Sequence, residues 1–108
     1  MSETSIHEMM LSIPEYFNAE KAVGISANVQ CIFTGEDASN WVITIEDQTC
    51  QVEQGIASEP DLTLKANAKD GVNLLTGKTD AMRAFILGKV KVSGNMALGM
   101  KLINLFKP

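Results

Sequence analysis

The sequence FILGKVKVSGNMALGMKLINLF, residues 85–106, changes its hydrophobic period halfway along. Residues 89–93 alternate lysine with valine, which predicts a short strand with one wet face. Gly94 and Asn95 then supply a turn and a helix cap, and residues 96–106 follow a helical period. A strand followed directly by a capped helix predicts a fold in which helices pack against a sheet.

The predicted last helix has an unusually wide apolar side. Its apolar residues span an arc of roughly 220°, whereas a surface helix needs an apolar stripe of only ~100°. The arc consists of Met96, Leu98, Met100, Leu102, Ile103, Leu105 and Phe106. Such a helix must be covered on most sides. Part of the arc can face an internal cavity that holds an apolar ligand, or another subunit or a membrane can cover it.

Upstream of this segment the period is two in four stretches, residues 25–33, 41–46, 50–53 and 62–66. These stretches predict four strands of the antiparallel type, each with one wet face. A capping box at residues 5–8 predicts a first helix, with a kink at Pro14. Two more helical segments follow the fourth strand. The order αββββααβα predicts one α+β domain over residues 1–108, with helices covering the apolar face of the sheet.

Charge is distributed unevenly along the chain. Residues 1–76 hold three basic and twelve acidic side chains, a net charge of −9, whereas residues 77–108 hold six basic and one acidic, a net charge of +5. The basic end indicates either contact with an anion or a scattered, solvated set of surface charges. The acidic total of −4 and the absence of an interleaved aromatic stripe argue against nucleic-acid binding.

The sequence offers little for catalysis or metal binding. His7 is the single histidine and has no partner at metal-ligand spacing. Residues 71–79 resemble a phosphate-binding loop, but five residues separate the two glycines where four are required. Cys31 and Cys50 alternate inward with their strands and are expected to be reduced core thiols. We therefore expect no catalytic residue, no metal and no cofactor. With neither a secretory signal nor an apolar run of ~18 residues, a cytoplasmic protein is expected.

Residues 85–102 resemble the Gly-Lys-(Leu/Val)-Lys-apolar-x-Gly-(Asn/Asp)-Met block of the sterol carrier protein 2 family. Residues 41–45, 60–64 and 75–78 resemble earlier blocks of this family in the same order. The resemblance implies a five-stranded, mostly antiparallel sheet with helices over one face and a hydrophobic tunnel between the layers. It also implies a ligand such as a fatty acid, an acyl-CoA ester or a sterol.

The expected function is non-catalytic carriage of one lipid-like ligand. The expected lining of the tunnel is Phe33, Trp41, Met82, Phe85, Ile86, Met96, Met100, Ile103 and Phe106. The expected contacts with an anionic head group or a transient anionic membrane surface are Lys78, Arg83, Lys89 and Lys91. A second hypothesis is an accessory domain whose last helix docks a partner subunit, and a third is an enzyme module that handles lipid thioesters. Either a monomer or a homodimer fits the first two hypotheses.

Overall fold

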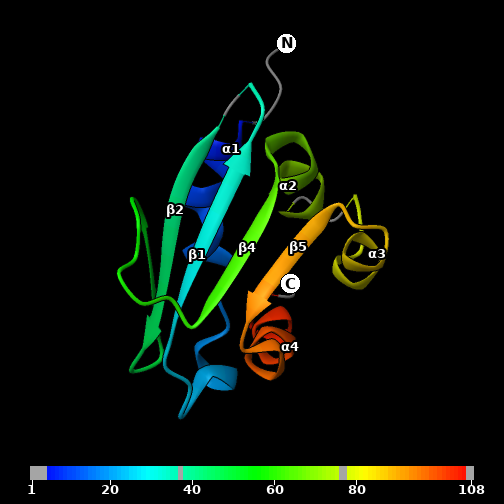
Figure 1. Ribbon diagram of the computed structural model, residues 1–108. Helices are drawn as coiled ribbons and strands as arrows, with labels where there is room; N and C mark the ends of the chain where they lie inside the picture. Colours follow the sequence, from blue (N-terminus) through cyan, green and yellow to red (C-terminus); the bar gives the residue numbers. More distant parts are fainter. Residues whose placement is uncertain (1–4, 37, 76–77, 107–108) are drawn as a thin grey trace.

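A five-stranded sheet organises the computed structural model, which describes residues 5–36, 38–75 and 78–106 (Figure 1). The strands are β1 (Ala27–Thr34), β2 (Ser39–Glu46), β3 (Thr49–Gln54), β4 (Leu62–Asn67) and β5 (Val90–Gly94). Their order in the sheet is β3-β2-β1-β4-β5. The three pairs β1–β2, β2–β3 and β4–β5 are antiparallel, and only β1–β4 is parallel. The expected α+β class with a five-stranded, mostly antiparallel sheet is confirmed.

The helices are short and accompany the sheet along its length. They are α1 (Ile6–Ser12), α2 (Ala68–Leu75), α3 (Ala81–Ile86) and α4 (Met96–Leu105), with the 3-10 helices η1 (Ile13–Tyr16) and η2 (Ala19–Ala22). In Figure 1, α1 lies behind β1 and β2, whereas α2, α3 and α4 lie along the β4–β5 side. Ser5 caps α1 as predicted, since its Oγ accepts a hydrogen bond from the Glu8 N–H at 3.1 Å. Pro14 lies in the first turn of η1, where α1 has ended.

The direction of β4 differs from the prediction. The fourth strand was expected to be antiparallel to its neighbours, but it runs parallel to β1, with Val29 opposite Leu62 and Cys31 opposite Leu64. The cause is the path of segment 55–61, which crosses from the edge strand β3 to the far side of β1. The segment runs back along the sheet, so that β4 starts at the same end of the sheet as β1 and runs in the same direction. Antiparallel pairing returns only between β4 and β5.

This crossing segment also covers part of the outer sheet face, which was expected to be wet. Gln30 of β1 is buried there and is fully hydrogen-bonded. Its Nε2 donates to the carbonyls of Trp41 and Gly55, both at 3.0 Å, and its Oε1 accepts from the Ala57 N–H at 2.6 Å. An unpaired buried amide would be costly, so the two bonds to Gly55 and Ala57 fix the segment on the sheet.

The core lies between the inner sheet face and the helices. Its most deeply buried large side chains are Trp41, Met10, Ile45, Leu62, Leu105 and Val29. Alternate residues of each strand point inward, as the period of two predicts. One inward row runs across the sheet through Trp41, Cys31, Leu64 and Val92, which follow one another as register partners. This row connects the core beneath α1 to the β4–β5 side.

Candidate functional site

Part of the inner sheet face is exposed to water, although this is the face that the helices cover. Leu64 of β4 and its register partner Val92 of β5 are only partly buried. Leu62 and Ala66, which precede and follow Leu64 on the same face of β4, are buried. Because β4 has a strand on either side, the exposure of Leu64 cannot come from a free strand edge. Because a well-packed interior has few voids, we interpret this partial exposure as a gap in the packing between the sheet and the helices.

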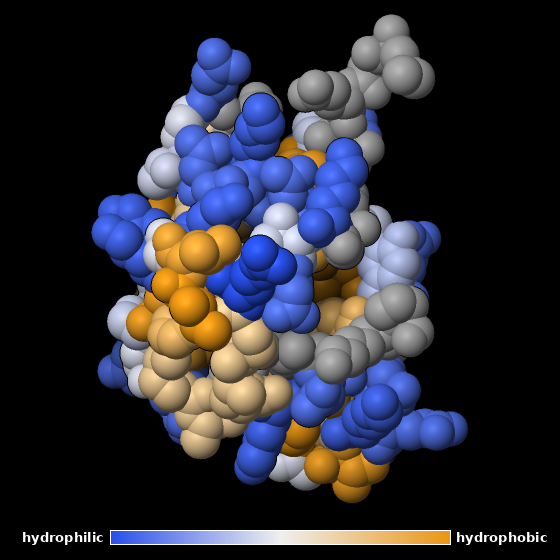
Figure 2. Space-filling view, turned by 90° about the vertical axis from the view of Figure 1, so that its right-hand side faces the viewer, coloured by the Kyte–Doolittle hydropathy of each residue, from blue (hydrophilic) through white to orange (hydrophobic). Residues whose placement is uncertain are grey.

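Two helices carry apolar side chains with the same partial exposure. Val72 and Leu74 of α2 and Leu98 of α4 pack against the core without being fully buried. Figure 2, which views the molecule from the side of α3 and α4, shows a recess with hydrophobic atoms below the surface. We call the partly exposed apolar region formed by Leu64, Val72, Leu74, Val92 and Leu98 the inner hollow.

The chemistry of the inner hollow is apolar. All five residues that define it are aliphatic, and none offers a hydrogen-bonding or charged side chain. Throughout the described part of the chain, no buried side-chain nitrogen or oxygen lacks a hydrogen-bond partner. A ligand would therefore be held there by removal of its apolar surface from water, with no fixed polar group to orient it.

Sequence reasoning named none of these five residues in the tunnel lining, although it placed Leu98 in the apolar arc of the last helix. The alternation of β4 and β5 places Leu64 and Val92 on the inner face, and this alternation can be read from the sequence. Partial exposure is what distinguishes them from ordinary core residues. It depends on how closely α2 and α4 approach the sheet, which no local pattern encodes.

Three of the nine residues expected to line a tunnel are wholly or partly buried. Phe33 and Trp41 belong to the core, and Phe106, just after α4, is half-buried. The ring of Phe106 packs against that of Phe17, with the ring centroids 5.7 Å apart.

Five other expected lining residues lie at the surface. The exposed side chains are Met82, Phe85 and Ile86 of α3 together with Met96 and Met100 of α4. The ninth residue, Ile103, lies in α4, but its side chain is outside the described part of the structure. The apolar arc of the last helix is thus only partly covered: Leu102 and Leu105 face the core, and the two methionines do not.

Trp41 occupies a defined position in the row that leads to the inner hollow. Its side chain is 1% exposed, and its Nε1 donates to the Ser39 Oγ at 2.8 Å. The ring of His7 meets it edge-on, with centroids 5.1 Å apart and an interplanar angle of 66°. Cys31 separates Trp41 from Leu64 in the row, so the backbones of Trp41 and Leu64 are two strand spacings, or about 10 Å, apart.

The four cations expected to meet an anion are all exposed. They are Lys78, Arg83, Lys89 and Lys91. Arg83 lies in α3, Lys89 follows that helix, and Lys91 lies in β5. Within the ranges that the structure describes, none of these side chains forms an ion pair. Their charges are therefore available to an external anion.

The two thiols are unsuited to nucleophilic chemistry. Burial raises the pKa of Cys31 from 9.0 to about 12 and that of Cys50 to about 11. Both are consequently protonated near neutral pH, and the thiol is a much weaker nucleophile than the thiolate. Among the residues described, no group of three or more His, Cys, Asp or Glu side chains could hold a metal ion. No helix in the described ranges is long and apolar enough to cross a membrane.

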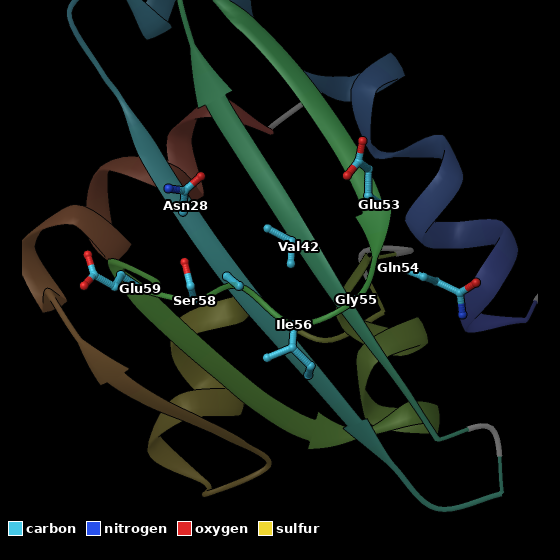
Figure 3. A pocket seen from close by; sticks show the side chains of 9 residues that line it. Asn28, Val42, Glu53, Gln54, Gly55, Ile56, Ser58 and Glu59 are labelled. Atoms are coloured by element: carbon cyan, nitrogen blue, oxygen red, sulfur yellow. The ribbon is translucent and has the colours of Figure 1, made fainter.

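A second, polar depression lies on the outer sheet face, where segment 55–61 crosses β1 and β2. It has a volume of about 450 Å³ and is open to solvent. Glu53 and Glu59 lie at opposite ends of it, with Val42 and Ile56 between them (Figure 3). The inner hollow remains the better candidate site.

Comparison with known proteins gives a consistent assignment. Residues 16–107 match the model of the SCP-2 sterol transfer family. Hydroxysteroid dehydrogenase-like protein 2 from Xenopus tropicalis is 28% identical over 98 residues, which cover 90% of this chain and 24% of that protein. Sterol carrier protein 2 from Homo sapiens is 35% identical over 71 residues, which cover 66% of this chain and 13% of that protein. The chain thus spans about a quarter or less of the length of these relatives.

A solved structure extends the likeness to the whole fold. The solution structure of palmitated sterol carrier protein 2 like 2 from Aedes aegypti superposes with a TM-score of 0.78 at 21% identity. The match covers 97% of this chain and 96% of that one. The family match over residues 16–107, together with this shared architecture, shows that the chain belongs to the SCP-2 sterol transfer family.

Proposed function

We propose that the chain binds one lipid-like ligand in the inner hollow and carries it without catalysing a reaction. The observation that carries this proposal is the partial exposure of Leu64 on a sheet face that helices cover. The palmitated state of a relative with the same fold supports it. We further propose that the carrier acts in the cytoplasm as a monomer or homodimer.

Apolar burial is sufficient to drive such binding. Each methylene removed from water contributes about 0.8 kcal/mol, so a long acyl chain gains on the order of 10 kcal/mol before ordering costs are subtracted. Because no polar group in the hollow dictates a head group, broad selectivity among fatty acids, acyl-CoA esters and sterols is expected. The aromatic side chains of Phe33, Trp41 and Phe106 would limit the width of the ligand.

The decisive experiment is native mass spectrometry of the purified protein, followed by organic extraction. A co-purifying lipid in a one-to-one complex, or one-to-one binding of added palmitate, would support carriage. Failure of palmitate, palmitoyl-CoA and cholesterol all to bind would refute the proposal.

Trp41 provides an optical signal for this binding. Saturating palmitate should change its fluorescence, because filling the hollow removes water near Leu64, whose backbone lies about 10 Å from that of Trp41, and alters the packing around Cys31. The measurement is an emission titration in parallel with native mass spectrometry. If mass spectrometry shows full occupancy while the emission stays constant in intensity and wavelength, Trp41 does not belong to the site.

The exposed cations should contribute to binding affinity when the ligand carries negative charge. Changing Lys89 and Lys91 together to Gln should weaken palmitoyl-CoA binding several-fold at low salt, because each basic residue contributes about 1 kcal/mol near an anionic group. The effect should fade at high salt. Isothermal titration calorimetry with palmitoyl-CoA and with uncharged cholesterol makes the comparison.

The matched control changes Lys21 and Lys69, which are exposed in other parts of the fold. Changing both to Gln removes the same charge and should leave palmitoyl-CoA affinity nearly constant. Equal losses in the two double variants would mean that only net charge matters, and the specific head-group role of Lys89 and Lys91 would be abandoned.

A specific observation favours the alternative of a docking domain. Met96 and Met100 leave part of the apolar arc of α4 uncovered, and a partner subunit or second copy could cover it. Native mass spectrometry separates the two functions, since a docking domain would carry no lipid. An enzyme module for lipid thioesters receives no comparable support from the protonated thiols.

A further inference from the structure

Helix α3 presents an apolar ridge outward. Ala84 is the residue that anchors it, being buried while α3 packs on β5. Met82 and Ile86 are four positions apart and therefore lie together on the opposite side of the helix from Ala84. Phe85 and Leu87 are exposed beside them. We call these four residues, Met82, Phe85, Ile86 and Leu87, the α3 ridge.

The ridge is held in place by the ends of its helix. At the start, the Asp80 carboxylate accepts a hydrogen bond from the Arg83 N–H at 3.1 Å. At the end, the Leu87 N–H donates to the Arg83 carbonyl at 2.9 Å, and Gly88 turns the chain with a φ of +76°. The Lys89 N–H then returns to the Ala84 carbonyl at 2.9 Å. The apolar side chains are thus displayed on a fixed support.

Basic residues lie close to the ridge along the chain. Arg83 lies within the same helix, Lys89 directly follows it, and Lys91 and Lys78 are exposed in the adjoining segments. Asp80 is the one acidic residue between residues 78 and 91, and it serves as the cap of α3. In Figure 2, this side of the molecule carries a hydrophobic patch bordered by hydrophilic residues.

We infer that the α3 ridge docks on the surface of an anionic lipid bilayer, with its apolar side chains in the interface and its cations at the head groups. Apolar residues flanked by Lys and Arg are the composition that binds such an interface. A second copy fits less well, because four side chains with these exposures offer on the order of 400 Å², about half of what each partner buries in a stable dimer. Two like-charged ridges would also repel.

The inference extends the proposed carrier function, since a carrier must collect and deliver its ligand at a membrane. Figure 1 places α3 and α4 on the same side of the molecule, and Figure 2 shows the recess on that side. Docking through α3 would therefore turn the opening of the inner hollow toward the bilayer and shorten the path of the ligand through water.

The test is flotation of the full chain with vesicles of phosphatidylcholine alone and of phosphatidylcholine mixed with phosphatidylserine. The protein should bind the mixed vesicles, more weakly as salt increases, and should bind the neutral vesicles little. Changing Ile86 and Leu87 together to Ser should reduce binding at least about tenfold, since two large side chains no longer leave water. These residues are 76% and 58% exposed, so the fold should persist, as circular dichroism would verify.

The matched control changes Ile56 and Leu11 to Ser. They are the same residue types, 70% and 56% exposed, and lie on the outer sheet face and on α1. This control should bind vesicles like the unmodified protein. Palmitate binding is measured separately, without vesicles, in the unmodified protein and in both double variants, so failure of docking and failure of the carrier function are distinct results.

Several outcomes would overturn the inference. The protein could fail to bind the mixed vesicles, or the Ile86 and Leu87 variant could bind them as well as the control does. Sedimentation could show that the unmodified protein self-associates and that the ridge variant is monomeric. That result would assign the ridge to a second copy of the chain.

Discussion

Replacing Gly94 with alanine should lower the free energy of unfolding by about 3 kcal/mol. Gly94 has a φ of +103°, which favours glycine. A Cβ at this position would lie 2.6 Å from the carbonyl oxygen of Asp61, which accepts the Asn95 N–H at 3.0 Å. The Asp61 oxygen and the Asn95 N–H both belong to the backbone, so neither can move aside without shifting the end of β5 or the start of β4. Urea unfolding followed by circular dichroism measures the change.

Gly88→Ala is the matched control for this prediction. Gly88 also has a positive φ, of +76°, but an added Cβ would meet nothing within 4 Å. Only the conformational cost remains, about 1 kcal/mol. Equal losses at the two positions would contradict the steric part of the argument. The difference matters for function, because Asn95 caps α4 through the Leu98 N–H, and a shift there would move one wall of the inner hollow.

Filling the inner hollow should abolish binding without harming the fold. Val92→Phe adds an aromatic ring beside Leu64, where both side chains are only partly buried. We expect the free energy of unfolding to change by less than about 1 kcal/mol and the dissociation constant for palmitate to rise at least tenfold. The two quantities are measured by urea unfolding and by palmitate titration on the same preparation.

Val29→Phe makes the same change on the same sheet face but in the packed core. Val29 is 2% exposed, so the larger ring must displace its neighbours at a cost of about 1–3 kcal/mol. The two variants therefore separate a hollow from a solid interior. If Val92→Phe destabilises the protein as much as Val29→Phe and leaves palmitate affinity intact, no ligand occupies the proposed position.

Local patterns in the sequence predicted much of the fold. The alternation in residues 25–33 and 41–46 located β1 and β2 within two residues, and Ser5 and Asn95 cap helices where expected. These features depend on neighbours in the chain, which is why local reasoning finds them. The parallel direction of β4 depends on where segment 55–61 crosses the sheet, and that path is set by distant contacts such as those of Gln30.

Less of the candidate site could be predicted from the sequence. Periodicity identified Met82, Phe85 and Ile86 as one apolar side of a helix, and such a side is ordinarily covered by the protein. In α3 the small buried Ala84 contacts the interior instead, and these large residues remain outside. Whether they and the methionines of α4 touch a ligand stays a prediction. Leu64 and Val92 were passed over because their exposure arises only after the helices are placed.

The parallel pairing of β1 with β4 costs more chain entropy than the pairing of β1, β2 and β3. β1, β2 and β3 are successive antiparallel neighbours, so their contacts close short loops of chain. By contrast, Val29 meets Leu62 across 33 positions, and β5, α3 and α4 come after that closure along the chain. Non-local pairing slows folding, since loop entropy is lost before the contacts repay it. The half of the sheet that carries the inner hollow is therefore the half for which the order of assembly matters most, and a bound ligand would stabilise only its completed form.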